Sequence, residues 1–133
     1  MQQRPDLLKP GAELGEVSIL FSDIANFSNI SGRMHAGDLF KMLNRYFEVS
    51  LGCVHETEGT VVKLIGDAIY AIWNAPFAQE DHRLRACRTA LLIQERLLEF
   101  EVTYQGLPLQ TRIGLHAGEV FVGNVGSTKR FDY

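Results

Sequence analysis

Residues 61–73 read VVKLIGDAIYAIW, two apolar runs rich in β-forming residues that are broken once, by Gly66 and Asp67. A glycine and an aspartate between two such runs are typical of a tight β-hairpin. We therefore expect strands over 61–65 and 68–73, with Asp67 at the turn. The simplest interpretation of Asp67 is a turn-forming residue, but a carboxylate at a hairpin tip is also placed to bind a ligand.

The first strand of this hairpin carries one charge, Lys63, in an otherwise apolar run. Strict alternation would place Lys63 on one face with Val61 and Ile65, and Val62 and Leu64 on the other. Both faces are then largely apolar, so we expect both to be covered, one of them by a partner chain. The alternative is that Lys63 extends along a sheet edge into solvent.

Composition indicates one soluble globular domain. The chain has 133 residues, 46% hydrophobic and 22% charged, which is enough for a core. A formal net charge of −3 gives no general attraction to nucleic acid or to an anionic membrane. No apolar run approaches the length of a membrane span, so we expect no membrane contact within this chain. A polyanionic ligand would need metal ions or a few placed cations.

The cysteines and histidines show no metal-ligand spacing. Cys53 and Cys87 lie in helix-like segments, so we expect buried free thiols, a reducing compartment and a cytoplasmic location. The four histidines are interpreted as structural or surface residues: His35, His55, His82 and His116.

The remaining segments alternate between strand and helix patterns. In chain order, we expect a polar lead-in over 1–15, a strand over 17–22 that ends at Asp23, helices over 38–58 and 81–104, and strands over 109–116 and 119–125 joined by a turn at Ala117-Gly118. One domain would then cover 16–133.

The first six elements follow the βαββαβ order of a ferredoxin-like α+β fold, an antiparallel sheet with both helices on one face. The other face of the sheet would be open. Right-handed crossovers would set the first strand beside the hairpin, which brings Asp23 and Asp67 together. Two carboxylates on rigid strand ends suit Mg²⁺ or Mn²⁺ holding the phosphates of a nucleotide.

Five segments together resemble the catalytic domain of class III nucleotidyl cyclases. They are LFSDIANFS at 20–28, LNRYF at 43–47, KLIGD at 63–67, QEDH at 79–82 and RIGLHAGEV at 112–120. The resemblance runs from about residue 16 to residue 133. It implies an adenylate or guanylate cyclase, which converts a nucleoside triphosphate into its 3′,5′-cyclic monophosphate and pyrophosphate at the interface of a homodimer formed through the open sheet face.

The same resemblance implies a role for particular residues. Two metal ions, Mg²⁺ or Mn²⁺, would be held by the carboxylates of Asp23 and Asp67 and the carbonyl of Ile24. The phosphates would meet the guanidinium of Arg112 and the backbone amides of a turn formed by Ala25, Asn26, Phe27 and Ser28. The family usually has glycine where this chain has Asn26, and asparagine enters the left-handed conformation more readily than most residues.

Lys63 matches the residue that reads the purine base across the dimer interface. Adenylate cyclases typically have lysine there and guanylate cyclases glutamate, so Lys63 indicates ATP. Three alternatives remain open: a guanylate cyclase, a non-catalytic cyclase-homology module that binds nucleotide or only dimerises, and another two-metal nucleotidyl transferase.

The resemblance also implies that the segment after Arg130–Tyr133 would supply a partner of Lys63 and the asparagine and arginine that act on the transition state. We therefore expect the 133-residue chain to keep the metal-binding half of the site and to be inactive alone.

Overall fold

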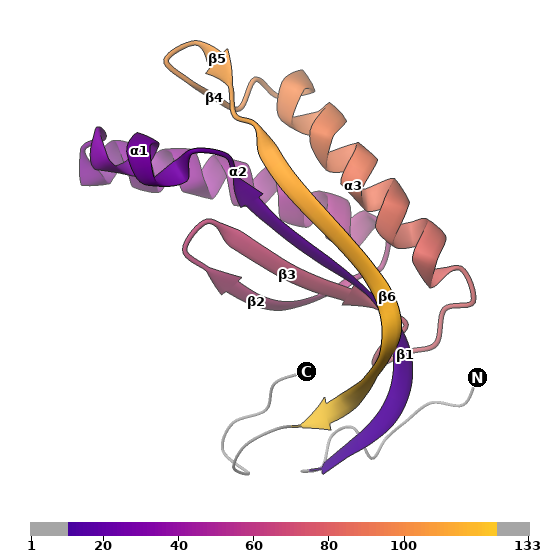
Figure 1. Ribbon diagram of the computed structural model, residues 1–133. Helices are drawn as coiled ribbons and strands as arrows, with labels where there is room; N and C mark the ends of the chain where they lie inside the picture. The colour runs from indigo at the N-terminus through magenta and orange to yellow at the C-terminus, as the bar shows by residue number, and fades with distance from the viewer. Residues whose placement is uncertain (1–10, 125–133) are drawn as a thin grey trace.

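The computed structural model describes residues 11–124, with side chains for residues 15–121. The elements in chain order are β1 (Gly11–Ile24), α1 (Phe27–Gly32), α2 (Ala36–Glu56), β2 (Thr60–Ile65), β3 (Ala68–Trp73), α3 (His82–Glu99), β4 (Thr103–Tyr104), β5 (Leu107–Pro108) and β6 (Thr111–Asn124) (Figure 1). The first ten residues of the expected lead-in, the expected strand end at residue 125 and the segment 130–133 lie outside the described residues.

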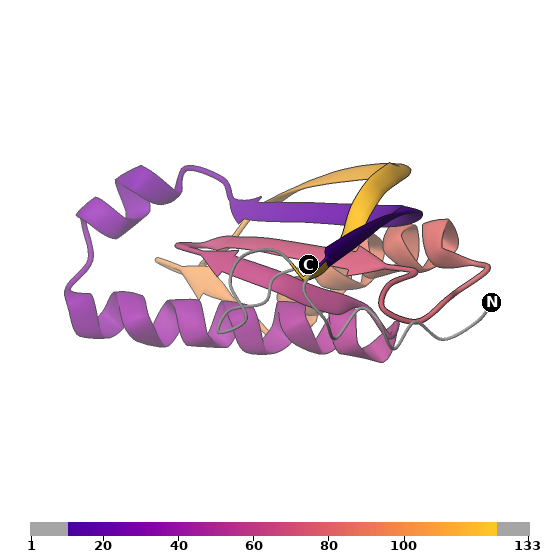
Figure 2. The same ribbon diagram turned by 90° about the horizontal axis from the view of Figure 1, so that it is seen from below.

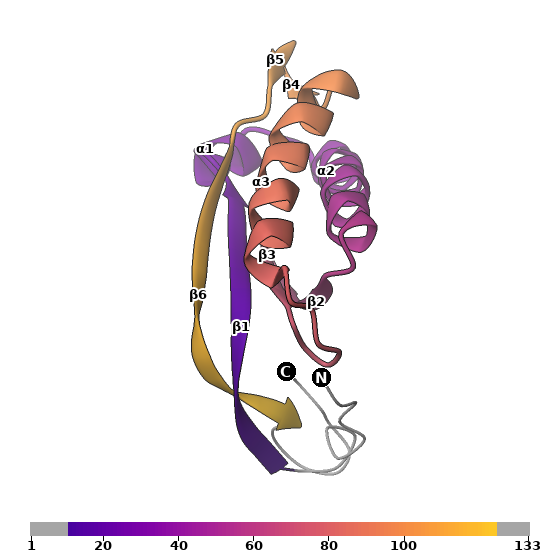
Figure 3. The same ribbon diagram turned by 90° about the vertical axis from the view of Figure 1, so that its right-hand side faces the viewer.

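The main sheet has the strand order β2-β3-β1-β6, and every neighbouring pair is antiparallel. Helices α2 and α3 lie on one face of it, with α2 running along the sheet (Figure 2) and both helices on the side opposite to the open face of β1 and β6 (Figure 3). This arrangement confirms the predicted ferredoxin-like α+β fold. It also confirms that β1 is central and lies beside the hairpin.

The predicted turn at Ala117-Gly118 is wrong, because residues 111–124 form one continuous strand. All fourteen residues of β1 are in register with β6, from the pair of Gly11 with Asn124 to the pair of Ile24 with Thr111. Ala117 and Gly118 lie within this ladder, opposite Ser18 and Val17. The ladder is long because β1 begins at Gly11, inside the expected lead-in, and so offers β6 a partner along its whole length.

The hairpin of β2 and β3 is confirmed, with Gly66 at φ 59° in its turn. A bulge between Val61 and Lys63 changes the expected alternation. Val61 packs into the core beneath the helices, whereas Val62 packs on the opposite, open face. Lys63 is opposite Tyr70 on that open face. The prediction that Val61 shares a face with Lys63 is therefore wrong.

The main core fills the space between the helices and the sheet, and Trp73 is its largest fully buried side chain. The indole of Trp73 leaves no room at Gly59, where an added Cβ would lie 2.7 Å from an indole carbon. The reason for glycine at this position is therefore close packing of the chain after α2 against the ring.

Both long helices end in the same way, with a glutamate in the left-handed conformation. Glu58 follows α2 at φ 61°, and the next amide, of Gly59, donates to the carbonyl of Val54 at 2.8 Å. Glu101 follows α3 at φ 53°, and the amide of Val102 donates back into the helix in the same pattern. These are Schellman endings. They end α3 at residue 99, five residues before the predicted end.

The cysteines are free, as predicted, but only Cys53 is buried. The expectation that Cys87 is buried is wrong, because it lies on the solvent side of α3. The start of α3 is fixed to β1 by His82, whose Nδ1 lies 2.7 Å from the hydroxyl of Ser18 and whose Nε2 lies 3.0 Å from a carboxylate oxygen of Glu16. His82 thus has a structural role.

Candidate active site at the end of the central strand

Two aspartates meet at the C-terminal end of β1. Asp23 is the second-last residue of the strand, and Asp67 is in the hairpin turn that adjoins it. A carboxylate oxygen of Asp67 accepts a hydrogen bond from the amide of Ile24 at 2.7 Å. This bond fixes the turn against the strand end. The structure therefore brings together the two carboxylates that the sequence placed at one end of the sheet.

Arg112 joins them from the neighbouring strand. It is directly opposite Asp23 in the ladder, and its Nε and one terminal nitrogen donate to the two carboxylate oxygens at 2.8 and 2.9 Å. These hydrogen bonds, together with the charge of Asp23, raise the pKa of Arg112 above its usual value. A two-pronged pair of this kind fixes the guanidinium plane as well as its position.

The turn after β1 has the backbone conformation expected of it. Asn26 is left-handed at φ 61° and ψ 27°, and α1 begins at the next residue. The amide of Ala25 donates to the carbonyl of Gln110 at 2.7 Å. Of the four amides that the sequence proposed for phosphate binding, the one from Ala25 is thus already engaged. Those of Asn26, Phe27 and Ser28 follow it around the turn.

The open face between these residues forms a shallow depression of about 370 Å³. Phe21, Asp23 and Arg112 line it together with Ser22, Ala68, Ile113 and Gly114. Its wall continues through the ring of Tyr70, whose centroid is 4.4 Å from that of Phe21. Lys63, opposite Tyr70 on β2, is exposed on the same face.

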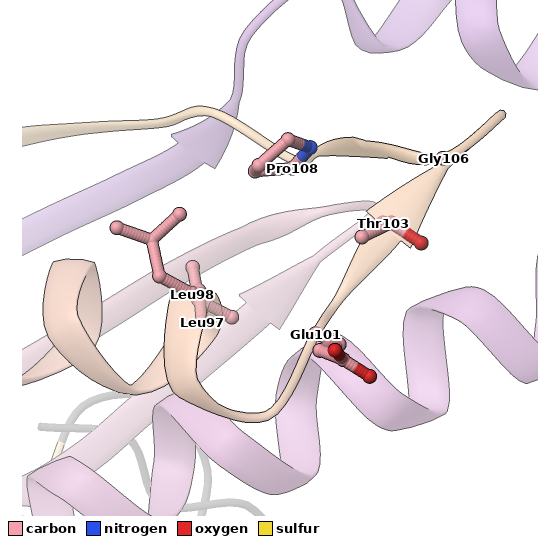
Figure 4. Close-up of a pocket in the computed structure, with 6 residues that line it drawn as sticks. All are labelled: Leu97, Leu98, Glu101, Thr103, Gly106 and Pro108. Carbon is pink, nitrogen blue, oxygen red and sulfur yellow. The ribbon is translucent and has the colours of Figure 1, made fainter.

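A second depression, of about 430 Å³, lies beside the end of α3 and the β4–β5 hairpin (Figure 4). Its lining residues are Leu97, Leu98, Glu101, Thr103, Gly106 and Pro108. The one charged side chain among them is an acid, which would repel phosphate. The depression of about 370 Å³ is therefore the better candidate for a nucleotide, because a cation and a carboxylate are both present there.

Sequence reasoning missed the groups that support Asp23 from beneath. The hydroxyl of Thr111 donates to the backbone carbonyl of Asp23 at 3.1 Å and lies 3.0 Å from the hydroxyl of Tyr46. Burial raises the pKa of Tyr46, which is completely covered. The available signal was a tyrosine on the buried stripe of a helix, because its hydroxyl needs a partner in the core.

The donor set suits a hard divalent cation only in part. Within residues 15–121 no group of three or more histidine, cysteine, aspartate and glutamate side chains could hold a metal ion. Two aspartates and the carbonyl of Ile24 nevertheless match the way Mg²⁺ is usually bound, through one or two carboxylates, with water and substrate phosphates completing the shell. The residues therefore fit a metal that arrives with a nucleotide.

The sequence model of the family described as "Adenylate and Guanylate cyclase catalytic domain" matches residues 10–133. Adenylate cyclase 1 of Rhizobium meliloti (strain 1021) is 36% identical over 141 residues, covering 96% of this chain and 21% of that protein. The crystal structure of the guanylyl cyclase Cya2 matches with a TM-score of 0.85 at 36% identity, covering 92% of this chain and 64% of that one. The adenylyl cyclase CyaB from P. aeruginosa shares the fold, with a TM-score of 0.83 at 24% identity and coverage of 92% and 66%. The chain therefore belongs to the class III adenylate and guanylate cyclase catalytic domains, as its motifs predicted.

The chain spans about a fifth of the length of the curated relatives it matches. Within the described residues, none of the helices has both the length and the apolar character that crossing a membrane requires.

Proposed function

We propose that this chain is the portion of an adenylate cyclase catalytic domain that carries the metal-binding half of the site, inactive alone, in an enzyme that converts ATP into 3′,5′-cyclic AMP and pyrophosphate. The observation that carries the proposal is the meeting of Asp23, Asp67 and Arg112 at one end of the open sheet face. In the reaction the 3′-oxygen bonds to the α-phosphorus and the bond from that phosphorus to the β-phosphate oxygen breaks. Pyrophosphate leaves, and the proton of the 3′-hydroxyl passes to water.

Two Mg²⁺ or Mn²⁺ ions, when bound, would favour ionisation of the 3′-hydroxyl and neutralise charge on the triphosphate. Asp23, Asp67 and the carbonyl of Ile24 would hold them. Arg112 would turn its guanidinium fork from Asp23 to the phosphate oxygens, which present the same planar pair of acceptors.

The phosphates would also meet the turn that follows β1. Because the amide of Ala25 is bonded to Gln110, we assign the backbone contacts to Asn26, Phe27 and Ser28. The left-handed Asn26 sets the direction in which the amides after it point.

We propose that Lys63 selects adenine. An ammonium group donates hydrogen bonds and adenine N1 accepts them, whereas guanine N1 carries a hydrogen and would oppose the lysine. The similarity to guanylyl cyclases such as Cya2 makes GTP the competing substrate. The base would be read across a homodimer formed through the open sheet face, where Phe21 and Ile65 are 52% and 65% exposed. The free cysteines agree with a cytoplasmic location.

The metal assignment is tested with Asp23→Asn and Asp67→Asn, each titrated with Mn²⁺ by calorimetry. Both changes keep the shape of the side chain and an oxygen acceptor, so the bond to the amide of Ile24 can persist while the charge is lost. We expect each to weaken Mn²⁺ binding more than tenfold. Asp38→Asn, in the exposed first turn of α2, is the matched control and should bind as the original chain does. Unchanged affinity in both site variants would contradict the two-metal assignment.

The base assignment is tested with Lys63→Glu, measuring ATP and GTP competition against a fluorescent nucleotide in the presence of Mn²⁺. An unpaired polar edge at a buried base costs about 1 to 3 kcal/mol, so the ratio of ATP to GTP affinity should fall about tenfold or more. Lys41→Glu, an exposed lysine on α2, controls for net charge. An unchanged ratio would remove Lys63 from base selection. Binding of neither nucleotide by the original chain would favour a non-catalytic dimerisation module.

A further inference from the structure

Helix α3 carries an exposed leucine seam on the side that faces away from the core. The seam consists of Leu84, Leu91 and Leu98, which are 57%, 71% and 62% exposed and are spaced seven residues apart. The buried stripe of the same helix, which includes Ile93 and Leu97, lies on the opposite side. Leucines that repeat every seven residues line up along one side of a helix, and an exposed apolar strip on an otherwise polar face is typical of a surface that contacts another protein.

We propose that the leucine seam of α3 is a self-association surface, which pairs antiparallel with α3 of a second copy of this chain. A two-fold axis at Leu91 sets that residue against its own copy and Leu84 against Leu98 of the second copy. The same axis places Arg88 beside Glu95 of the second copy, on the same flank of the seam. Arginine against glutamate in two symmetric pairs is the charge complementarity that an antiparallel contact needs.

Two further observations favour a second copy of this chain as the partner of the leucine seam. Arg88 and Glu95 are both exposed on α3. The charge of Arg88 acts on the carboxylate of Asp81, but within residues 15–121 neither Arg88 nor Glu95 has a hydrogen bond or ion pair, so both can pair with a second copy. Leu98 lines the depression beside the end of α3, as does Pro108 (Figure 4). This depression has a volume of about 430 Å³, and Leu84 of the second copy would enter it.

The seam does not compete with the dimer proposed for catalysis. Helix α3 covers one face of the sheet (Figure 3). The depression with Asp23 is lined by residues of the other face. One chain can therefore make both contacts at once. A single pair of helices buries less than the roughly 800 Å² per partner of a stable interface, so the seam contact is weak by itself. Its binding energy would add to that of the dimer formed through the open sheet face.

Disulfide trapping tests the geometry on the full 133-residue chain, with Cys87→Ser as the background. Leu91→Cys lies on the two-fold axis and should cross-link to itself under mild oxidation. Leu84→Cys should not, because fourteen residues of helix, about 21 Å, separate it from its copy. A mixture of Leu84→Cys and Leu98→Cys chains should form the mixed dimer. Self-cross-linking of all three variants at equal rates would show a parallel or random contact and overturn the proposal.

Charge reversal is an independent test, read by sedimentation equilibrium and independent of cyclase activity. Arg88→Glu should weaken association of the seam about tenfold, because it replaces two attractive pairs by two repulsive ones. Adding Glu95→Arg should restore it. Failure of the double variant to recover, or equal association of all chains, would refute the pairing. Circular dichroism checks that each exposed substitution leaves the fold intact.

Discussion

Replacing Arg112 with alanine should strengthen the binding of Mn²⁺ while weakening the binding of a nucleotide. In the structure both carboxylate oxygens of Asp23 accept hydrogen bonds from Arg112, at 2.8 and 2.9 Å. A cation that binds Asp23 must displace this fork, and it also approaches a positive charge. Because Arg112 is 68% exposed, solvent screens the pair, and the gain in Mn²⁺ affinity should be about two- to fivefold. Rising salt should reduce the gain.

The assay is calorimetric titration of Mn²⁺, followed by titration of a non-hydrolysable triphosphate into the metal-loaded chain. Arg83→Ala is the matched control: Arg83 is 66% exposed and pairs with one carboxylate, Glu16, so its loss should leave Mn²⁺ affinity unchanged. Opposite changes in metal and nucleotide affinity would be hard to explain by a fold defect. Weaker Mn²⁺ binding in Arg112→Ala would refute the reasoning, since it would mean that Arg112 does not compete for Asp23.

Three further predictions concern stability, each measured by urea unfolding. Glu101→Gly should raise the free energy of unfolding by about 0.5 to 1 kcal/mol, because φ 53° strains every residue with a Cβ; a decrease would argue against a strained ending. His82→Phe should cost about 1 to 3 kcal/mol by leaving the buried Ser18 hydroxyl without its partner, and Ser18→Ala added to it should recover part of the loss. Because burial raises the pKa of Tyr46 above 10.0, the folded chain holds that proton more tightly than the unfolded chain, so stability should fall as pH rises above 10. Tyr46→Phe should flatten that decline, and an equal decline in both chains would exclude Tyr46 as its cause.

The hairpin and the meeting of the two aspartates could be predicted from sequence because each depends on local rules. Gly66 and Asp67 between two β-rich runs specify a turn, and the handedness of crossovers decides which strand lies beside it. Once that neighbour is known, Asp23 and Asp67 must lie at the same end of the sheet. No distant side chain has to be known.

The misses occur where the outcome depends on a distant partner. Ala117 and Gly118 have the composition of a turn, and only the length of β1 keeps them in a strand. The bulge between Val61 and Lys63 cannot be recognised in the sequence. Both faces of β2 are largely apolar, so a shift by one residue does not change the hydrophobic pattern. The hydroxyl of Thr111 supports Asp23 across 88 positions of sequence. Local propensity contains none of this information.

The central position of β1 has a consequence for how the chain is synthesised. Both neighbours of β1 are made after it, β3 first and β6 last, and Arg112 leaves the ribosome 89 residues after Asp23. At the usual pace of translation that delay is on the order of ten seconds. During it the central strand has a free hydrogen-bonding edge beside apolar residues, the condition under which nascent chains pair wrongly with one another. The ion pair between Arg112 and Asp23 can therefore form only after β6 has been made.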